Sequence, residues 1–237
     1  MTELPEEGWL SADQVARLAA AGARSRPAGA VVEIGSFRGR STVVLARAAG
    51  SVIAIDPHAG SDRGPQEIAA DATRGDSDFE VFHANLERFG VADRVRHVRT
   101  FSSAAHADVT GPLSLLFVDG AHRFGPARSD IAEWGRRVAP GGVMLVHDSF
   151  SSIGVTLALL AECAGSTRWR YVGRSRSLAE YERRAVAPGV GERVRDVARQ
   201  LAELPWFARN VAIKGLVTAK LGKAAKALGH DGETWPY

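Results

Sequence analysis

The stretch VVEIGSFRGRST, residues 31–42, decides the fold of this chain. Its apolar start is typical of a buried strand, and Glu33 stands at the end of that run. A turn marked by Gly35 and Gly39 follows and leads into a segment typical of a helix. A strand, a glycine-containing turn and a helix in this order are typical of a site for nucleotide-like ligands. The rest of the sequence must show which ligand fits.

The composition is that of an ordinary globular protein without disulfides. Of the 237 residues, 45% are hydrophobic and 24% are charged, which is usual for a soluble domain. Cys163 is the single cysteine, so an internal disulfide is excluded and a cytoplasmic location is expected. The acidic start MTELPEEGWL is unlike a signal peptide, and no uninterrupted apolar stretch reaches about 18 residues, so we expect no membrane span. The net charge of +3 and a pI near 9.3 are weak indications of anionic partners.

Apolar runs alternate with helix-like segments from residue 28 onward. Nearly continuous apolar runs indicate strands buried on both faces, and we expect them at 30–35, 51–56, 95–101, 113–119 and 142–148. Helices are expected at 9–23, 40–49, 78–90, 102–108 and 126–138. This alternation predicts an α/β fold with a doubly wound, Rossmann-like and mostly parallel sheet.

The last third of the chain follows a different pattern. Residues 168–174 and 177–183 alternate in polarity across a short turn, which predicts a terminal antiparallel pair of strands. Residues 191–229 are predicted to be helical with a break at Pro205. We therefore expect an N-terminal helical segment at 1–27, a ligand-binding catalytic domain at 28–185 and a helical extension at 186–237. The amphipathic lysine-rich part of this extension either packs on a second subunit in a homo-oligomer, touches an anionic surface, or is a solvated helix.

The residues that finish the predicted strands are the most informative ones, because ligands of such sheets bind beyond the carboxyl ends of the strands. In chain order these strand ends are Glu33, Asp56, Phe101–Ser102, Asp119 and His147–Asp148. Four of the five carry an ionisable side chain. A fold without a polar ligand has no need of them there.

The glycine spacing argues against a dinucleotide. A dinucleotide turn reads G-x-G-x-x-G, and its second glycine lets the backbone approach a pyrophosphate. Here the pattern is E-x-G-x-x-x-G, with Phe37 in place of the second glycine, and Glu33 would repel a phosphate. An acid at this point suits the ammonium group of S-adenosylmethionine, which has no phosphate. Asp56 can accept hydrogen bonds from the ribose of either ligand and does not discriminate.

Four motifs carry a resemblance to a known family: VVEIGSFRGRST, AIDPH, FVDGAHRFGPARSDIAEW and APGGVMLVHD. Over roughly residues 28–185 the chain resembles the class I S-adenosylmethionine-dependent methyltransferases. Within that class it resembles the metal-dependent O-methyltransferases of the catechol, macrolide-sugar and cephalosporin-hydroxylase-like type. The resemblance implies a methionine end near Glu33, Gly35, Ser36 and Ser41, a ribose at Asp56 and an adenine beside Ser102, with Gly39 and Asp119 as further cofactor-binding residues.

Asp119, His122 and Asp148 are the candidate residues for the chemistry. The two aspartates end neighbouring strands of the predicted sheet, so both can face one divalent cation, and oxygen ligands suit Mg²⁺. His122 follows Asp119 by three residues and can act as the general base for an acceptor hydroxyl. The family usually has an oxygen ligand beside the second aspartate, whereas this chain has His147, which weakens Mg²⁺ binding or favours Mn²⁺. The alternative is that both aspartates only cap loops and His122 lies at the surface.

The expected reaction is methylation of a hydroxyl on a sugar, an oligosaccharide or a related polar metabolite. A phenol or another small natural product is the alternative acceptor. An RNA methyltransferase is a weaker hypothesis, because an N/D-P-P-Y tetrad is lacking and basic residues do not cluster with aromatic ones, so we expect no nucleic-acid partner. A cofactor-binding protein without activity and an NAD-dependent dehydrogenase are the other hypotheses.

Two further segments have weaker interpretations. The polar stretch 58–77 is long for a connection and is either a lid over the substrate or a disordered loop. Asp130 and Trp134 are interpreted as structural residues on one face of a helix.

Overall fold

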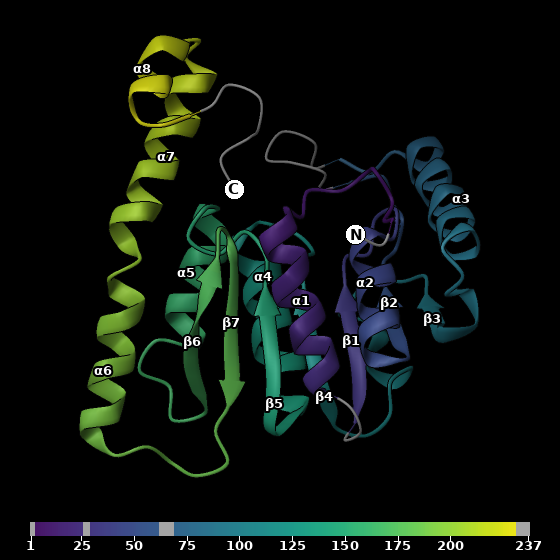
Figure 1. Ribbon diagram of the computed structural model, residues 1–237, viewed down its shortest axis with the longest axis horizontal. Coiled ribbons are helices and arrows are strands. Elements are labelled where there is room, and N and C mark those ends of the chain that lie inside the picture. The colour runs from purple at the N-terminus through teal and green to yellow at the C-terminus, as the bar shows by residue number, and fades with distance from the viewer. Residues whose placement is uncertain (1–2, 26–28, 62–68, 231–237) are drawn as a thin grey trace.

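The computed structural model describes residues 3–25, 29–61 and 69–230. Its centre is a seven-stranded sheet in the order β3-β2-β1-β4-β5-β7-β6 (Figure 1). The parallel strands are β1 (Ala30–Ile34), β2 (Val52–Ile55), β3 (Val95–Val98), β4 (Leu113–Val118) and β5 (Val138–Val146). The strand β7 (Leu178–Arg183) runs antiparallel to both β5 and β6 (Trp169–Ser175). The predicted fold class and the terminal antiparallel pair are confirmed.

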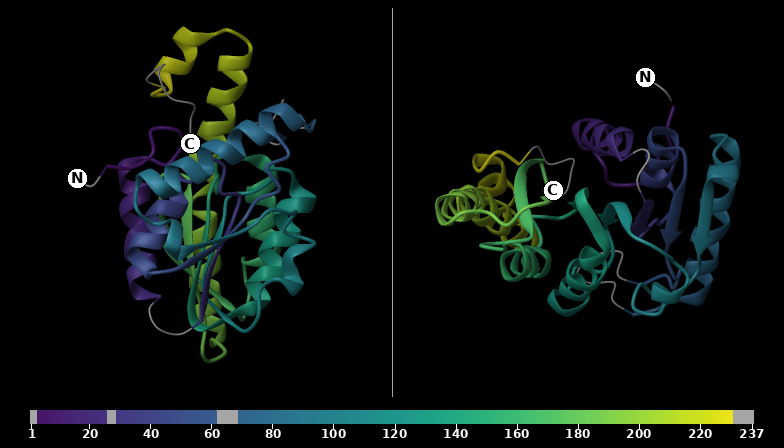
Figure 2. Two further views of the ribbon diagram at one scale, coloured as in Figure 1. Left: turned by 90° about the vertical axis from the view of Figure 1, so that its right-hand side faces the viewer. Right: turned by 90° about the horizontal axis from the view of Figure 1, so that it is seen from below.

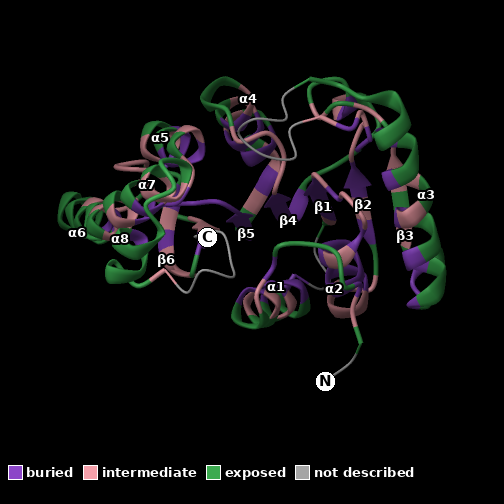
Figure 3. Ribbon diagram, turned by 90° about the horizontal axis from the view of Figure 1, so that it is seen from above, coloured by how far each residue is buried: buried purple, intermediate pink, exposed green. Residues whose placement is uncertain are grey.

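The apolar strands are buried on both faces because neighbouring side chains along a strand point to opposite sides. Val31, Leu115 and Phe117 belong to one core, and Val32 and Leu116 belong to the other. The first core is closed by α1 (Ala12–Arg24), α2 (Arg40–Ala49) and α3 (Ala72–Arg88), and the second by α4 (Phe124–Ser129) and α5 (Ile153–Glu162). Figure 3 shows α1 and α2 on one side of the sheet and α4 and α5 on the other.

Three helices follow the sheet: α6 (Val190–Leu201), α7 (Leu204–Thr218) and α8 (Gly222–Ala227). They lie at the β6 end of the molecule, far from β3 (Figure 2). Trp206 and Phe207 of α7 pack against the second core. Pro205 lies in the first turn of α7, where the missing N–H costs no helical hydrogen bond. The predicted break at this proline is therefore present just before the helix.

Several predicted element boundaries are wrong. The helix expected at 102–108 is a single 3₁₀ turn, Ala105–Ala107. The helix expected at 126–138 begins earlier as α4, widens into a π-helical turn at Asp130–Trp134 and ends in a 3₁₀ turn. α3 begins at Ala72, where the Asp71 side chain accepts a hydrogen bond from the Arg74 backbone, so the connection after β2 is shorter than the stretch 58–77. Residues 62–68 of the predicted lid lie outside the described residues.

Candidate active site

A cavity of about 690 Å³ opens at the carboxyl ends of the parallel strands. Its walls come from the ends of β1, β2, β4 and β5, from the segment before α1 and from α7. The strand order reverses between β1 and β4, and a sheet of this kind binds its ligands beside such a reversal. Of the predicted site residues, those lining the cavity are Gly35, Asp56, Ser102, Asp119, His122, His147 and Asp148.

The turn after β1 is held by the Asp56 carboxylate. One Asp56 oxygen accepts hydrogen bonds from the backbone N–H groups of Ser36 and Phe37, both at 2.9 Å, and the other accepts from the His58 N–H at 2.7 Å. Asp56 thus joins the first turn to the loop after β2. A carboxylate has about four acceptor positions, so one is left for a ligand. Its ribose role stays a prediction.

Glu33 does not reach the main cavity. Its side chain is fully buried and accepts a hydrogen bond of 2.5 Å from the Thr42 hydroxyl on α2. Burial raises the pKa of Glu33 to about 8, although hydrogen bonds from Ser41 and Thr42 oppose the shift. Ser36 and Ser41 line only a small hollow beside Gly35 and Trp9, and Gly39 precedes α2 against Phe82. The methionine end of a cofactor at these residues stays a prediction.

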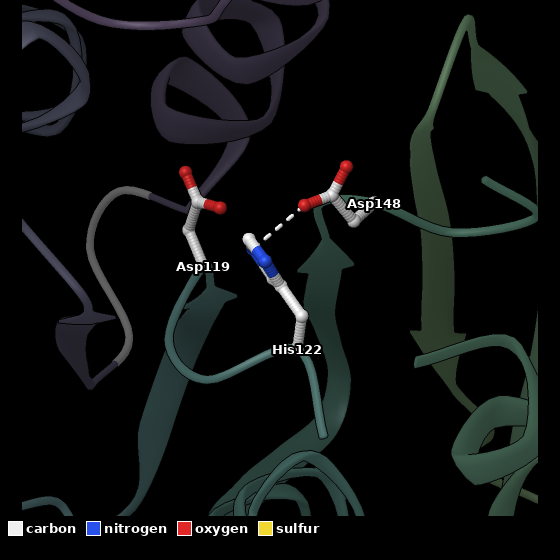
Figure 4. A group of neighbouring side chains, drawn as sticks. All are labelled: Asp119, His122 and Asp148. Carbon is white, nitrogen blue, oxygen red and sulfur yellow. Dashed lines mark ion pairs between the residues drawn. The ribbon is translucent and has the colours of Figure 1, made fainter. Parts of the chain in front are cut away.

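The three candidate catalytic residues converge on one point (Figure 4). Asp119 follows β4, Asp148 follows β5, and His122 rises between them from the loop after β4. One ligand atom from each residue lies within 4.8 Å of the other two. His122 Nε2 is 2.7 Å from Asp148 Oδ2. Burial lowers the pKa of His122, but the Asp148 charge and hydrogen bond outweigh burial and raise it overall.

His147 forms a second histidine–aspartate pair beside the first. Its Nδ1 is 2.9 Å from Asp119 Oδ1 and 3.9 Å from Asp148 Oδ2. Burial opposes the charged imidazole, yet the two aspartate charges raise the pKa of His147 to about 9. Burial also opposes the charged form of Asp148 and would raise its pKa. The positive charges of His147 and His122 outweigh burial and hold the pKa of Asp148 well below its ordinary value.

The cluster fits a divalent cation. Asp148 is buried, and its Oδ1 has no hydrogen-bond partner among the residues that the structure describes. Such an acceptor is costly to bury unless a donor or a cation meets it. The Asp148 backbone has φ of 57°, an unusual conformation for a residue with a side chain, and it turns this carboxylate toward Asp119 and His122. His122 belongs to this cluster, and His147 lies beside it, so the expected role of His147 as a third ligand stays a prediction.

Two cavity residues were missed by sequence reasoning. Asp130, interpreted above as structural, lines the cavity next to Gly120. Lys214 of α7 also lines it, and its Nζ donates a hydrogen bond of 3.2 Å to the Ser151 carbonyl. Burial lowers the pKa of Lys214, while Asp148 opposes that shift. The sequence held a signal for Asp130, because this residue belongs to the motif FVDGAHRFGPARSDIAEW. It held no signal that places Lys214 at the cavity.

Among the described ranges of the chain, every helix is too short or too polar to cross a lipid bilayer.

Exposed apolar side chains occur at the mouth of the cavity. Trp9, Phe101 and Ile153 line it and are 48%, 57% and 56% exposed. The mouth is therefore partly apolar, in contrast to the charged floor.

Known proteins share this fold. Residues 32–149 match a family described as "Methyltransferase domain". The crystal structure of cofactor-bound Rv0187 from MTB is 27% identical, with a TM-score of 0.50, and the match covers 77% of this chain and 84% of that one. The O-methyltransferase NovP is 16% identical, with a TM-score of 0.58 and coverage of 73% and 80%.

A third solved structure is TomG from Streptomyces achromogenes, an O-methyltransferase in complex with SAM. It is 21% identical, with a TM-score of 0.52, and the match covers 75% of this chain and 82% of TomG. At these identities NovP and TomG show the fold. The match over residues 32–149 identifies a methyltransferase domain in this chain, and in fold the chain is similar to the O-methyltransferases NovP and TomG.

Proposed function

We propose that this enzyme transfers the methyl group of S-adenosylmethionine to a hydroxyl oxygen of a sugar, an oligosaccharide or a related polar metabolite, with the help of a divalent cation such as Mg²⁺. The observation that carries this proposal is the cluster of Asp119, His122 and Asp148 at the floor of the cavity. Two carboxylates and an imidazole at one point suit a hydroxyl acceptor, which must lose its proton before it can attack.

Different residues are proposed to bind the cation and to accept the proton of the hydroxyl. Asp119 and Asp148 would hold the cation, and His147 stays the predicted third ligand because its Nδ1 faces both carboxylates. Such a cation would supply Lewis-acid chemistry, which lowers the pKa of a coordinated hydroxyl. Mn²⁺ is an alternative because of the imidazole. We assign the base role to His122: its Nε2 lies 2.7 Å from Asp148 Oδ2 in the structure, and it can accept the hydroxyl proton once Asp148 binds the cation and no longer accepts a hydrogen bond from this nitrogen.

The polar wall of the cavity supports a polar acceptor. Lys214 and Thr218 of α7 line it on the side of the catalytic cluster, and Ser151 and Ser152 line it at the start of α5. These groups can hydrogen-bond several hydroxyls of one acceptor. A phenol or another flat natural product is the second candidate acceptor, supported by the exposed Trp9, Phe101 and Ile153 at the mouth.

The proposal is tested by methyl transfer to matched panels of sugars and phenols, before and after treatment with EDTA. We expect EDTA to abolish transfer and Mg²⁺ or Mn²⁺ to restore it. His122→Ala should lower kcat by roughly 10²- to 10⁴-fold, as expected for loss of a general base, while the affinity for S-adenosylhomocysteine stays unchanged. Transfer that is indifferent to EDTA in every panel would contradict the metal assignment.

A second pair of variants separates the two histidines. If His147 is a ligand, His147→Ala should raise the cation concentration needed for half-maximal activity at least tenfold, since losing a ligand weakens the metal site. His122→Ala should leave that concentration nearly unchanged and lower the maximal rate instead. Equal effects of both variants on the cation requirement would contradict a base role for His122.

A further inference from the structure

Acidic side chains gather at the β3 end of the cavity. Outside the catalytic cluster, the acids that line it in the described part of the chain are Asp56, Asp78 and Asp130. Asp56 follows β2, Asp78 belongs to α3, and Asp130 accepts a hydrogen bond of 2.5 Å from Ser102, which follows β3. S-adenosylmethionine carries a positive sulfonium and a positive ammonium group, and most of its predicted contacts lie on this side of the cluster. The charges of this end therefore suit the cofactor.

Basic side chains line the opposite end of the cavity. Histidines aside, those that line it among the described residues are Arg123, in the loop after β4, and Lys214 of α7. The helix α7 lies at the β6 end of the molecule, far from β3 (Figure 2). The lining of the cavity thus changes from acidic to basic across the catalytic cluster.

The chain that leads into α5 connects both basic residues to the catalytic histidine. Lys214 Nζ donates a hydrogen bond of 3.2 Å to the Ser151 carbonyl. A few residues further, a β-carbon on Gly154 would lie 2.2 Å from the His122 carbonyl oxygen and 2.9 Å from the backbone carbonyl carbon of Arg123. Lys214 and Arg123 therefore border the same wall of the cavity, next to His122.

The acceptor must extend along this wall. Its hydroxyl has to reach the Asp119 cluster, and most of the predicted cofactor contacts occupy the other side of that cluster. The part of the cavity left for the rest of the acceptor is lined by Arg123, Lys214 and Thr218. Positive charge in a partly enclosed cavity attracts an anion, and a charged donor strengthens the hydrogen bonds that the anion accepts.

We propose that the acceptor carries an anionic group, a carboxylate or a phosphate, near the hydroxyl that is methylated, and that Lys214 and Arg123 bind this group. Both are specificity-determining residues, since they contact the acceptor and not the reacting atoms. The inference rests on the proposed methyl transfer, because the catalytic cluster defines which end of the cavity receives the acceptor. Among polar acceptors it selects uronic acids and sugar phosphates over neutral sugars, and among phenols it selects those with a carboxylate.

Calorimetric binding of matched acceptor pairs to the full chain, with S-adenosylhomocysteine and Mg²⁺ present, tests the proposal. The pairs are methyl glucuronide with methyl glucoside, glucose 6-phosphate with glucose, and 3,4-dihydroxybenzoate with 3,4-dihydroxybenzamide. We expect the charged member of at least one pair to bind roughly 10- to 100-fold more tightly than the neutral member, the range for hydrogen bonds to a charged group. This preference should shrink as added salt screens the charges. The pair that shows it distinguishes a carboxylate from a phosphate.

Charge variants separate the basic wall from the cation, which could itself attract an anion. Lys214→Met should lower the preference about tenfold, and Lys214→Glu should abolish it. Arg123→Gln should lower it only about 2- to 5-fold, because Arg123 is exposed and exposed ion pairs are weak. Lys223→Met and Arg128→Gln are the matched controls, since neither residue lines the cavity and Arg128 pairs with Glu162. Their preference should equal that of the wild type.

The preference is a ratio within one protein, so a partly destabilised variant does not imitate the effect. Equal or weaker binding of the charged member in every pair, or a preference that survives in Lys214→Glu, would overturn the inference. Methyl transfer to neutral acceptors as efficient as to charged ones would also overturn it and leave the proposed reaction standing. A preference in binding without any methyl transfer would count against the proposed reaction alone. Binding of no member of any pair would overturn this inference together with the proposed acceptor class.

Discussion

Glu33 is an acid enclosed by the packing of α2 on β1. The residue is fully buried, and its Oε1 has no hydrogen-bond partner among the described residues. Burial raises the pKa of Glu33 to about 8, so the folded protein keeps the proton over a pH range in which the unfolded chain has lost it. The native state then binds more protons than the unfolded state, and stability must fall as pH rises through that range.

We predict that Glu33→Gln flattens the pH dependence of stability. In the wild type the free energy of unfolding should decline between about pH 4.5, the ordinary pKa of the group, and pH 8, its pKa in the fold. The amide can still accept the Thr42 hydrogen bond but does not ionise, so the variant should lose this decline. Urea unfolding of both proteins at pH 5, 6.5 and 8 measures it. Parallel pH profiles of the two proteins would show that Glu33 is not the source.

The elements β1 and β4 approach each other closely where both end. Gly35 has φ of 86°, and a β-carbon there would lie 2.2 Å from the Asp119 carbonyl oxygen. This contact fixes the turn after β1 against the strand end that presents Asp119. Glycine is required at this point for two reasons, the left-handed backbone and the lack of space.

Gly35→Ala should therefore cost more than a backbone effect alone. We expect a loss of about 3 kcal/mol or more in the free energy of unfolding, from overpacking added to backbone strain. Gly111→Ala is the control: its φ is 75°, but a β-carbon there has nothing within 4 Å, so it should lose only about 1 kcal/mol. Denaturant unfolding compares the two. Similar losses would mean that the close approach to Asp119 is not what requires glycine.

At the scale of the whole molecule, the helix α7 of the C-terminal extension packs back over the sheet and forms one wall of the cavity. Val211, Lys214 and Thr218 line it, and Asn210 Nδ2 donates a hydrogen bond of 3.3 Å to the Phe150 carbonyl just after β5. These residues lie outside the matched range 32–149. This wall of the cavity is thus built by a part of the chain outside the range that matches the family.

We predict that Lys214→Met raises the KM for the acceptor about tenfold, the value of one lost charge-assisted hydrogen bond. The affinity for S-adenosylhomocysteine should stay unchanged, because Lys214 lies beside Ser151 and Asp148 and none of the predicted cofactor contacts is on α7. Lys223→Met on α8 is the control, since Lys223 is exposed and does not line the cavity. Steady-state kinetics with the acceptor found in the panels provides the readout. A change in cofactor affinity without a change in KM would contradict this division of the cavity.

The sequence by itself determined the sheet, its parallel and antiparallel parts, and the strand ends that bear Asp119 and Asp148. These follow from short-range patterns, because apolar runs and glycine turns specify elements within a few residues. The boundaries after β4 were wrong because a π-helical turn keeps a helical pattern while it rotates the side chains that follow, and the segment after β3 forms a single 3₁₀ turn where a longer helix was expected.

Only the tertiary structure decided which side chains face the cavity. The pleat of β1 turns Glu33 under α2, where it accepts a hydrogen bond from Thr42, and the packing of distant segments brings Ser102 to Asp130 and Lys214 to Ser151. Those partners are 28 and 63 residues apart. A local pattern extends over only a few residues and carries no information on such pairs, so their meeting depends on how the helices pack on the finished sheet.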